Sequence, residues 1–310
     1  MQTKNTVDDK IVFPASGPFS LQDESAYQQW REKKLSIYPM CVADLVVEID
    51  NPLALTASEK ASILERCQKM NMAVYQLKNP SGDPADKDPI KKLGEQMGLA
   101  RLDSNLCADN DSITSLKVVA DGRHQTYIPY STYKISWHTD GYYNSLDHQI
   151  HGLFLHCVTP AMKGGENALM DHEIAYIHLR DTNPDYIHAL MQPDAMTIPA
   201  NEENGSVIRN EQTGPVFSVD PTDGHLHMRY TARTRSIVWK NDNMTKKAAA
   251  CLSEFLNSDS EFIFRHTLQS GQGLISNNVL HDRTAFEDSD NEADKRLLYR
   301  ARYFDRIANT

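Results

Sequence analysis

The amino-acid sequence predicts an α+β protein that is mostly β, with a helical N-terminal region packed on a body of short strands. From about residue 112, short apolar or alternating runs recur and turn residues separate them, which is typical of a β-sandwich or barrel. These runs cover residues 113–120, 133–137, 150–158, 216–219, 226–230, 261–266, 273–279 and 297–304. Helical patterns interrupt the series near 172–191, with a break at Asn183-Pro184, and near 245–256, where Thr245 is the expected N-cap.

The first 110 residues are expected to form two helices and a strand. Thr56 followed by Glu59 is a capping box, and apolar residues at helical spacing come next, so we expect a helix over 56–70. A strand over 72–77 and a helix over 88–98 follow. We expect a single domain over residues 1–310, in which residues 1–110 pack on a barrel formed by residues 111–310 and its two helical inserts.

Composition and charge restrict the class of protein. The chain of 310 residues has a formal net charge of −10, which argues against a nucleic-acid partner because such a partner requires a basic surface. Its five cysteines are scattered and form no CxxC pair, so we expect a reducing cytoplasm rather than disulfides or a zinc site. No run approaches the roughly 20 apolar residues of a membrane span, so no membrane contact is expected. A homo-oligomer is left open.

The segment Trp137-His138-Thr139-Asp140-Gly141 has the pattern of a metal site. In an extended chain, side chains at i and i+2 point to the same face, so His138 and Asp140 can converge on one ion. Two histidines and a carboxylate bind non-haem iron(II) and leave positions open for a co-substrate and oxygen. A His-x-Asp pair alone is most often a surface pair, but His281 follows at the end of the apolar run 273–279 and supplies a third ligand.

Two arginines after His281 suit an acidic co-substrate. Arg296 comes 15 residues later, and Arg300 follows in the same predicted strand. The planar guanidinium forms paired hydrogen bonds with a carboxylate, such as the distal carboxylate of 2-oxoglutarate. Strand alternation would put both arginines on one face, so either of them can bind that carboxylate.

Together, these motifs resemble those of the taurine dioxygenase-like (TauD/TfdA) superfamily of iron(II)- and 2-oxoglutarate-dependent oxygenases. That superfamily includes γ-butyrobetaine and trimethyllysine hydroxylases and clavaminate synthase. The resemblance covers residues 130–304 and rests on four motifs in order: His138-Thr139-Asp140, Gly164-Gly165-Glu166, His281-x-Arg283 with Phe286, and the closing arginine strand. It implies a double-stranded β-helix (jelly roll) core with flanking helices and iron at one mouth of the barrel.

The resemblance also implies residue roles. His138, Asp140 and His281 would hold iron(II), and Arg296 would bind the distal carboxylate of 2-oxoglutarate. Asn167 stands where the family often has a hydroxyl residue that assists this arginine, and Arg300 stands where some relatives meet an acidic substrate group. Tyr142, Tyr143 and Arg233 are further candidate substrate contacts; the alternatives are a packed loop for the tyrosines and a solvated basic turn for the arginine.

The expected activity is that of a 2-oxoglutarate-dependent dioxygenase. It would consume O2 and 2-oxoglutarate and hydroxylate an unactivated C–H bond of a small polar or zwitterionic metabolite, similar to an amino acid or a betaine. Asp140 is retained, which predicts oxygen transfer rather than the halogenation of relatives that lack the carboxylate. One alternative is a jelly-roll enzyme that uses another divalent metal for hydrolysis or isomerisation and has no need of Arg296. The other is a non-catalytic binding module, against which the intact ligand set argues.

Overall fold

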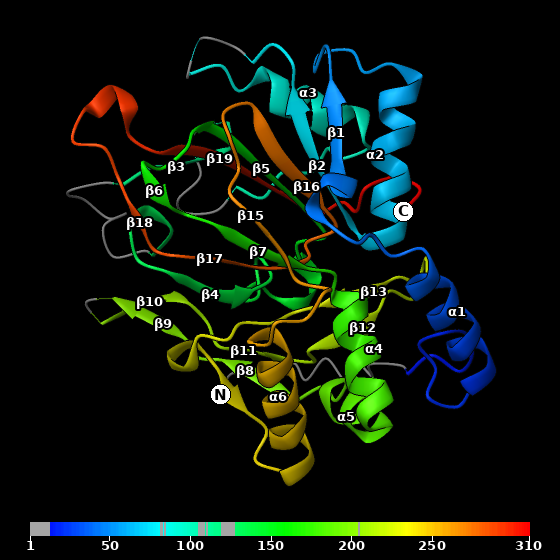
Figure 1. The fold of residues 1–310 in the computed structure, drawn as a ribbon. Coiled ribbons are helices and arrows are strands. Elements are labelled where there is room, and N and C mark those ends of the chain that lie inside the picture. The colour runs from blue at the N-terminus through cyan, green and yellow to red at the C-terminus, as the bar shows by residue number, and fades with distance from the viewer. Residues whose placement is uncertain are drawn as a thin grey trace.

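The computed structural model describes residues 13–80, 83, 85–104, 109, 111–118, 128–203 and 205–310. Two sheets pack face to face and helices lie outside them (Figure 1). The larger sheet has the strand order β1-β2-β16-β5-β19-β3 and is antiparallel except for the β1–β2 pair. Its strands are β1 (Val46–Ile49), β2 (Met72–Leu77), β3 (Thr114–Leu116), β5 (Gly152–Thr159), β16 (Gln272–Ser276) and β19 (Leu297–Tyr303). The smaller sheet, β15-β7-β17-β4, is antiparallel and consists of β4 (Ile135–His138), β7 (Asn167–Met170), β15 (Phe264–His266) and β17 (Leu280–Arg283).

The larger sheet is covered on both faces. In β19, Leu298 belongs to the apolar cluster between the two sheets, whereas Tyr299 and Ala301 belong to a second cluster under α2 (Ala57–Met70) and α3 (Asp88–Gln96). Successive strand residues point to opposite faces, so Arg300 shares the inner face with Leu298. The sheet therefore directs a cationic side chain into the space between the sheets.

The N-terminal elements form close to where the sequence pattern places them. The Thr56 hydroxyl accepts a hydrogen bond from the Glu59 amide, and the Glu59 carboxylate accepts one from the Thr56 amide, so the predicted capping box is confirmed. Such a cap stabilises a helix by about 1 kcal/mol. Strand β2 has the predicted bounds, and α3 ends two residues before the predicted position.

Helix α1 (Glu24–Ser36) and strand β1 were not indicated by the sequence pattern. The described residues of α1 bury only Tyr27 and Lys34, so the helix has no apolar stripe at helical spacing. It is stabilised instead by distant contacts, because Lys34 pairs with Asp171 and Glu173 and the ring of Tyr27 lies under the Arg180 guanidinium. Local periodicity cannot reveal a helix of this kind.

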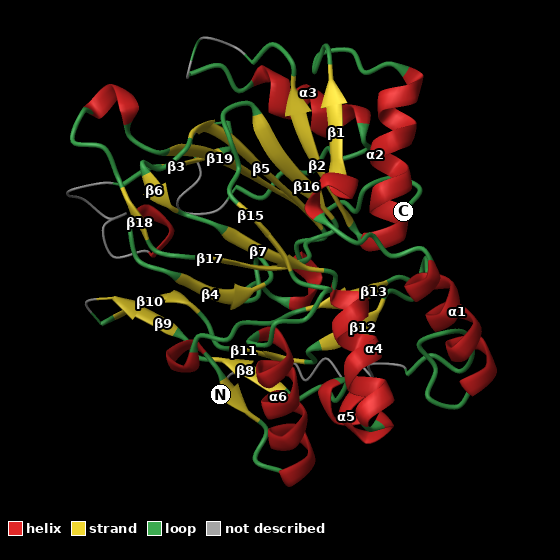
Figure 2. Cartoon of the chain, in the orientation of Figure 1, coloured by secondary structure: helices red, strands yellow, loops and turns green. Residues whose placement is uncertain are grey.

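The two helical inserts form three helices: α4 (His172–Thr182), α5 (Pro184–Leu190) and α6 (Asn243–Leu256). They pack against one another on the side of the molecule opposite α2 and α3 (Figure 2). The break at Asn183-Pro184 is confirmed, whereas Thr245 as N-cap is wrong. Asp242 caps α6, because its carboxylate accepts hydrogen bonds from both the amide and the hydroxyl of Thr245.

Short strands occupy the rest of the inserts and the rim of the sandwich. They are β6 (Lys163–Gly164), β8 (Met196–Ile198), β9 (Asn201–Glu203), β10 (Ser206–Arg209), β11 (Gln212–Gly214), β12 (Phe217–Val219), β13 (Leu226–Met228), β14 (Val238–Trp239) and β18 (Phe286–Glu287). Within the described part of the chain, each helix is too short or too polar to cross a lipid bilayer.

Two predicted strands differ from the observed ones. The run 273–279 is divided, because β16 ends at Ser276 and Asn278, with a φ of 52°, turns the chain into β17 of the other sheet. His281 therefore lies inside a strand of its own. The expected strand over 113–120 shortens to β3, and residues 119 and 120 lie outside the described residues.

Candidate metal centre

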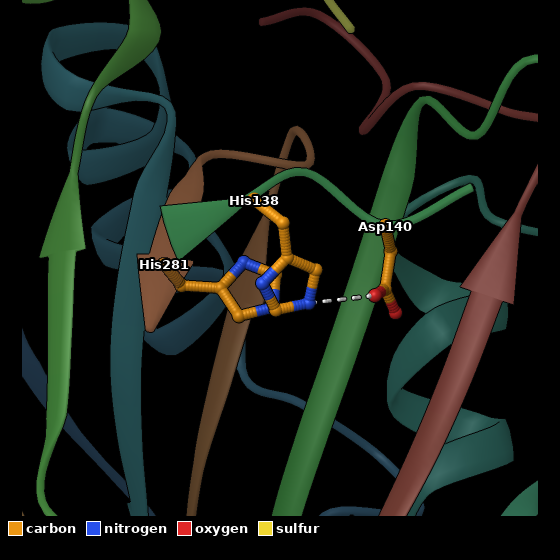
Figure 3. A group of neighbouring side chains, drawn as sticks. All are labelled: His138, Asp140 and His281. Carbon is orange, nitrogen blue, oxygen red and sulfur yellow. Dashed lines mark ion pairs between the residues drawn. The ribbon is translucent and has the colours of Figure 1, made fainter. Parts of the chain in front are cut away.

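The structure brings His138, Asp140 and His281 together (Figure 3). One ligand atom from each lies within 4.8 Å of the other two, and this is the one such group among the residues that the structure describes. His281 is the direct cross-strand partner of His138, and their ring centroids are 4.2 Å apart. Asp140 follows the end of β4, and its Oδ1 lies 3.4 Å from Nε2 of His138. The pairing of β17 with β4 thus joins two segments that are 143 residues apart.

Both histidines present Nε2 to the centre of this group. Nδ1 of His138 lies 2.9 Å from the carbonyl oxygen of Ser136, and Nδ1 of His281 lies 3.0 Å from that of Val279. A carbonyl oxygen only accepts, so each Nδ1 carries the hydrogen and each Nε2 has a free lone pair. Burial lowers the pKa of His281 to about 4, with the neighbouring His138 as a further cause, so its imidazole is neutral near pH 7.

Asp140 is a buried carboxylate that lacks a complete set of partners. Burial raises its pKa, but the positive charges of Arg300 and Arg302 lower that pKa well below the usual value. Its Oδ2 lies 3.5 Å from Nη1 of Arg300 and accepts no hydrogen bond from any described residue. A charged oxygen and two imidazole lone pairs directed at one point are the donors that a divalent metal requires. The group fits iron(II).

Arg296 lies in a second buried cationic site, together with Arg283. Each guanidinium carbon is 4.8 Å from the ring centroid of Phe286, and both side chains belong to residues that are 4% exposed. Burial and the neighbouring positive charge of Arg296 lower the pKa of Arg283 to about 9. Burial also lowers the pKa of Arg296. Within the described chain, no carboxylate forms an ion pair with either. Two buried cations of this kind are stabilised when an anion binds beside them.

The Gly-Gly-acidic turn lies against this arginine site. A Cβ atom at Gly165, whose φ is 73°, would lie 3.9 Å from Nε of Arg296 and 3.6 Å from Cβ of Phe286. Asn167 follows the turn on the face of β7 that also carries Leu169, the cross-strand partner of His281. Its Nδ2 donates to the carbonyl oxygen of Asp282.

The two candidate arginines for 2-oxoglutarate occupy different places. Arg300 reaches the carboxylate of Asp140, whereas Arg296 lies over Phe286. The expected alternation does not extend from one to the other, because β19 begins at Leu297 and its register with β5 shifts between Leu297 and Leu298.

The candidate substrate residues line one side of the metal group. Tyr142 lies edge-on to His138, with ring centroids 6.4 Å apart, and Tyr143 lies edge-on to Tyr142 at 5.1 Å. Arg233 is exposed, and its charge acts on Tyr142, whose pKa burial nevertheless raises.

Arg302, to which the sequence pattern assigned no role, contacts one of these two tyrosines. Its Nη1 lies 2.6 Å from the Tyr143 hydroxyl, and its Nη2 pairs with Asp103. The position of Arg302 two residues after Arg300 in a strand was the signal that could have found it.

A family model confirms where this chain belongs. The model of the Taurine catabolism dioxygenase TauD, TfdA family matches residues 76–302, and the chain is a member of that family. The predicted family membership is therefore confirmed.

The chain is also similar to two curated relatives and, in fold, to a solved structure. The chain is 31% identical over 176 residues to a uridine-5′-phosphate dioxygenase of an Amycolatopsis species. This match covers 54% of this chain and 60% of that protein. It is 27% identical over 201 residues to a protein of the same name from a Streptomyces species, which covers 63% of this chain and 71% of that protein. The structure of an asparagine oxygenase in complex with Fe(II), 2S,3S-3-hydroxyasparagine and succinate superimposes with a TM-score of 0.57 at 14% identity, covering 79% of this chain and 78% of that one.

These similarities confirm the predicted fold class, and the matched family is one of dioxygenases, as predicted. The arrangement is a jelly roll with flanking helices. The roles of individual residues remain predictions, which the geometry above supports.

Proposed function

We propose that this chain is an iron(II)- and 2-oxoglutarate-dependent dioxygenase that hydroxylates a C–H bond of a small anionic metabolite. The observation that carries the proposal is the buried group of His138, Asp140 and His281, in which two Nε2 atoms and a charged carboxylate converge. The rival use of another divalent metal for hydrolysis has no need of Arg296, which is 4% exposed and lies over the ring of Phe286.

Iron(II), when bound, would supply the chemistry in which 2-oxoglutarate and O2 yield succinate and CO2 while the second oxygen atom enters the substrate as a hydroxyl group. The chain supplies geometry. His138, Asp140 and His281 would hold the metal, and three protein ligands would leave it free to bind the co-substrate and oxygen. Arg296, with Arg283 beside it, would bind the distal carboxylate of 2-oxoglutarate, and Asn167 would border that site. Tyr142 and Tyr143 would exclude water from the substrate side.

The substrate class follows from the side chains around the metal group. Arg300, on the inner face of β19, and Arg233 are cations, and the Tyr142 ring lies beside His138, so we propose a substrate with an anionic group and a planar ring. A nucleoside 5′-monophosphate is the first class to test, because both curated relatives are named uridine-5′-phosphate dioxygenases. Amino acids form the comparison set.

We also propose one domain over residues 1–310, because β1 and β2 of the N-terminal region share a sheet with β19. A reducing cytoplasm is proposed from the cysteines, since Cys41, Cys67, Cys157 and Cys251 are all free thiols.

Anaerobic addition of iron(II) and 2-oxoglutarate to the metal-free protein tests the proposal. A visible metal-to-ligand charge-transfer band is expected, and it should be absent with His281→Ala. Uridine 5′-monophosphate should shift the band and, after O2 is admitted, give one succinate for each hydroxylated product. A protein that binds iron(II) and shows no band with 2-oxoglutarate would refute the dioxygenase assignment. A band that amino acids shift and nucleotides do not would refute the substrate class alone.

A further inference from the structure

Asn278 forms an unusual set of contacts in the turn between β16 and β17. The residue is 2% exposed and adopts a φ of 52°, a left-handed conformation that asparagine tolerates better than most residues. Its Oδ1 accepts a hydrogen bond of 2.8 Å from the backbone amide of Asp140. Its Nδ2 donates to the carbonyl oxygens of Asp140, at 2.9 Å, and Ile150, at 2.7 Å. The side-chain amide therefore binds both ends of the Asp140 residue.

Asp140 depends on these contacts because it lies outside the regular strand. Strand β4 ends at His138, and Gly141 turns the chain at a φ of 68°. A Cβ atom at Gly141 would lie 2.4 Å from Cγ1 of Ile150, so the segment is also closely packed there. The backbone amide and carbonyl of Asp140 are thus held by a side chain rather than by the β4–β17 ladder.

The same turn also leads to the other arm of the metal group. His281 comes three residues after Asn278, and its Nδ1 is fixed by the carbonyl oxygen of Val279, the residue that follows Asn278. One asparagine consequently connects the segment that carries Asp140 to the segment that carries His281.

We propose that Asn278 is the positioning residue of the metal centre: its side-chain amide holds the Asp140 peptide in register with His281, so that carboxylate and imidazole are preorganised for one ion. The inference rests on the proposed metal role of Asp140. Residues that orient metal ligands through hydrogen bonds typically change metal affinity by about 10- to 100-fold when they are replaced.

The neighbouring Asn277 provides a matched control. It is 3% exposed, and its amide also forms three hydrogen bonds, donating to Asn71 Oδ1 and Thr310 Oγ1 and accepting from the amide of Ile307. None of these partners belongs to the metal group. Truncation of either side chain removes three hydrogen bonds, so a purely structural role predicts a similar loss of stability and no difference in metal affinity.

The test compares Asn278→Gly, Asn278→Asp and Asn277→Ala in the full chain. Glycine keeps the left-handed backbone and removes the amide, whereas aspartate keeps the acceptor for the Asp140 amide and removes both donors. Cobalt(II) affinity is measured by anaerobic titration of the metal-free protein, with the visible cobalt spectrum as a signature of coordination, and folding is checked by circular dichroism.

We expect Asn278→Gly to weaken cobalt(II) binding by about 10- to 100-fold and to alter the spectrum, with a smaller change for Asn278→Asp. Asn277→Ala should bind cobalt(II) within about twofold of the wild type even if it melts earlier. Equal affinity in the wild type and a folded Asn278 variant would overturn the inference. Should Asn278→Gly not fold, Asn278→Asp decides by the same criterion. A wild-type protein that binds no divalent metal would instead refute the proposed function.

Discussion

Two buried clusters of carboxylates and cations in the described part of the chain differ in how closely their charges are paired. In the cluster of Lys34, Asp171 and Glu173, the ammonium lies 2.6 Å from Asp171 and 2.5 Å from Glu173. Oδ1 of Asp171 also accepts hydrogen bonds from Asn71 and from the Glu173 amide. At the metal group, the nearest cation, Arg300, lies 3.5 Å from Oδ2 of Asp140, whereas Lys34 lies 2.6 Å from Oδ2 of Asp171.

The difference separates a structural cluster from a functional one. Charges removed from water are stabilised only where the geometry of their partners is good, and the Lys34 cluster meets that requirement with groups of the protein alone. The Asp140 group does not, so it retains an unfavourable arrangement that a cation would relieve. Substitutions in the Lys34 cluster should therefore lower the free energy of unfolding, and substitutions in the Asp140 group should lower activity.

The largest expected effect is the loss of catalysis in Asp140→Ala. Loss of the carboxylate leaves two imidazoles to hold the metal, so kcat should fall by at least about a thousandfold, equivalent to about 4 kcal/mol. The free energy of unfolding of the metal-free protein should change far less, because the lost carboxylate forms only a long ion pair with Arg300. Succinate production and chemical denaturation measure the two quantities. An Asp140→Ala variant that stays active but folds poorly would contradict this expectation, because Asp140 would then stabilise the fold rather than serve the reaction.

The opposite behaviour is expected for Lys34→Met. Removal of the ammonium leaves Asp171 and Glu173 buried without a cation, which should lower the free energy of unfolding by about 3–5 kcal/mol. Iron(II) affinity of the folded fraction should stay unchanged. The exposed pair of Arg31 and Asp181 is the control, since Arg31→Met should cost less than about 1 kcal/mol.

The pH dependence of the Lys34 cluster has a definite sign. Burial raises the pKa of Asp171, but Lys34 and further partners lower it below the usual value. A lowered folded-state pKa stabilises the protein above the unfolded-state value of about 3.9, and this stabilisation is lost as the pH falls through the folded-state pKa. The difference in unfolding free energy between wild type and Lys34→Met should therefore shrink as the pH is lowered from about 4 toward the folded-state pKa of Asp171. A difference that grows over this interval would contradict the ion-pair explanation.

The contrast between the clusters also explains what could be predicted from the sequence. The metal ligands were recognisable because His138 and Asp140 are two residues apart and because a second histidine, His281, follows a strand-like run. The cross-strand pairing of His281 with His138 and the approach of Arg300 to Asp140 depend on contacts between distant strands. No local pattern encodes them.

Helix α1 escaped prediction for the same physical reason. Its stability comes from the long-range pairing of Lys34 with Asp171 and Glu173, rather than from propensity or an apolar stripe. The division of the run 273–279 could not be predicted either. An asparagine such as Asn278 permits a left-handed turn but does not require one. Short-range patterns therefore predicted the elements, and tertiary contacts determined the site.

The smallest of the expected effects concerns Arg296, a buried cation that forms no ion pair with a carboxylate of the described residues. Arg296→Ala should raise the KM for 2-oxoglutarate by about 10- to 100-fold, because a hydrogen-bonded contact with a charged group contributes about 1.5–3 kcal/mol. Arg300→Ala should raise the KM of the substrate and leave that of 2-oxoglutarate within about threefold, since Arg300 faces Asp140 and not Phe286. Both constants are measured with the second compound saturating. If Arg300→Ala carries the 2-oxoglutarate defect and Arg296→Ala does not, the two assignments must be exchanged, and the arginines over Phe286 would then be a structural cluster without a counter-ion.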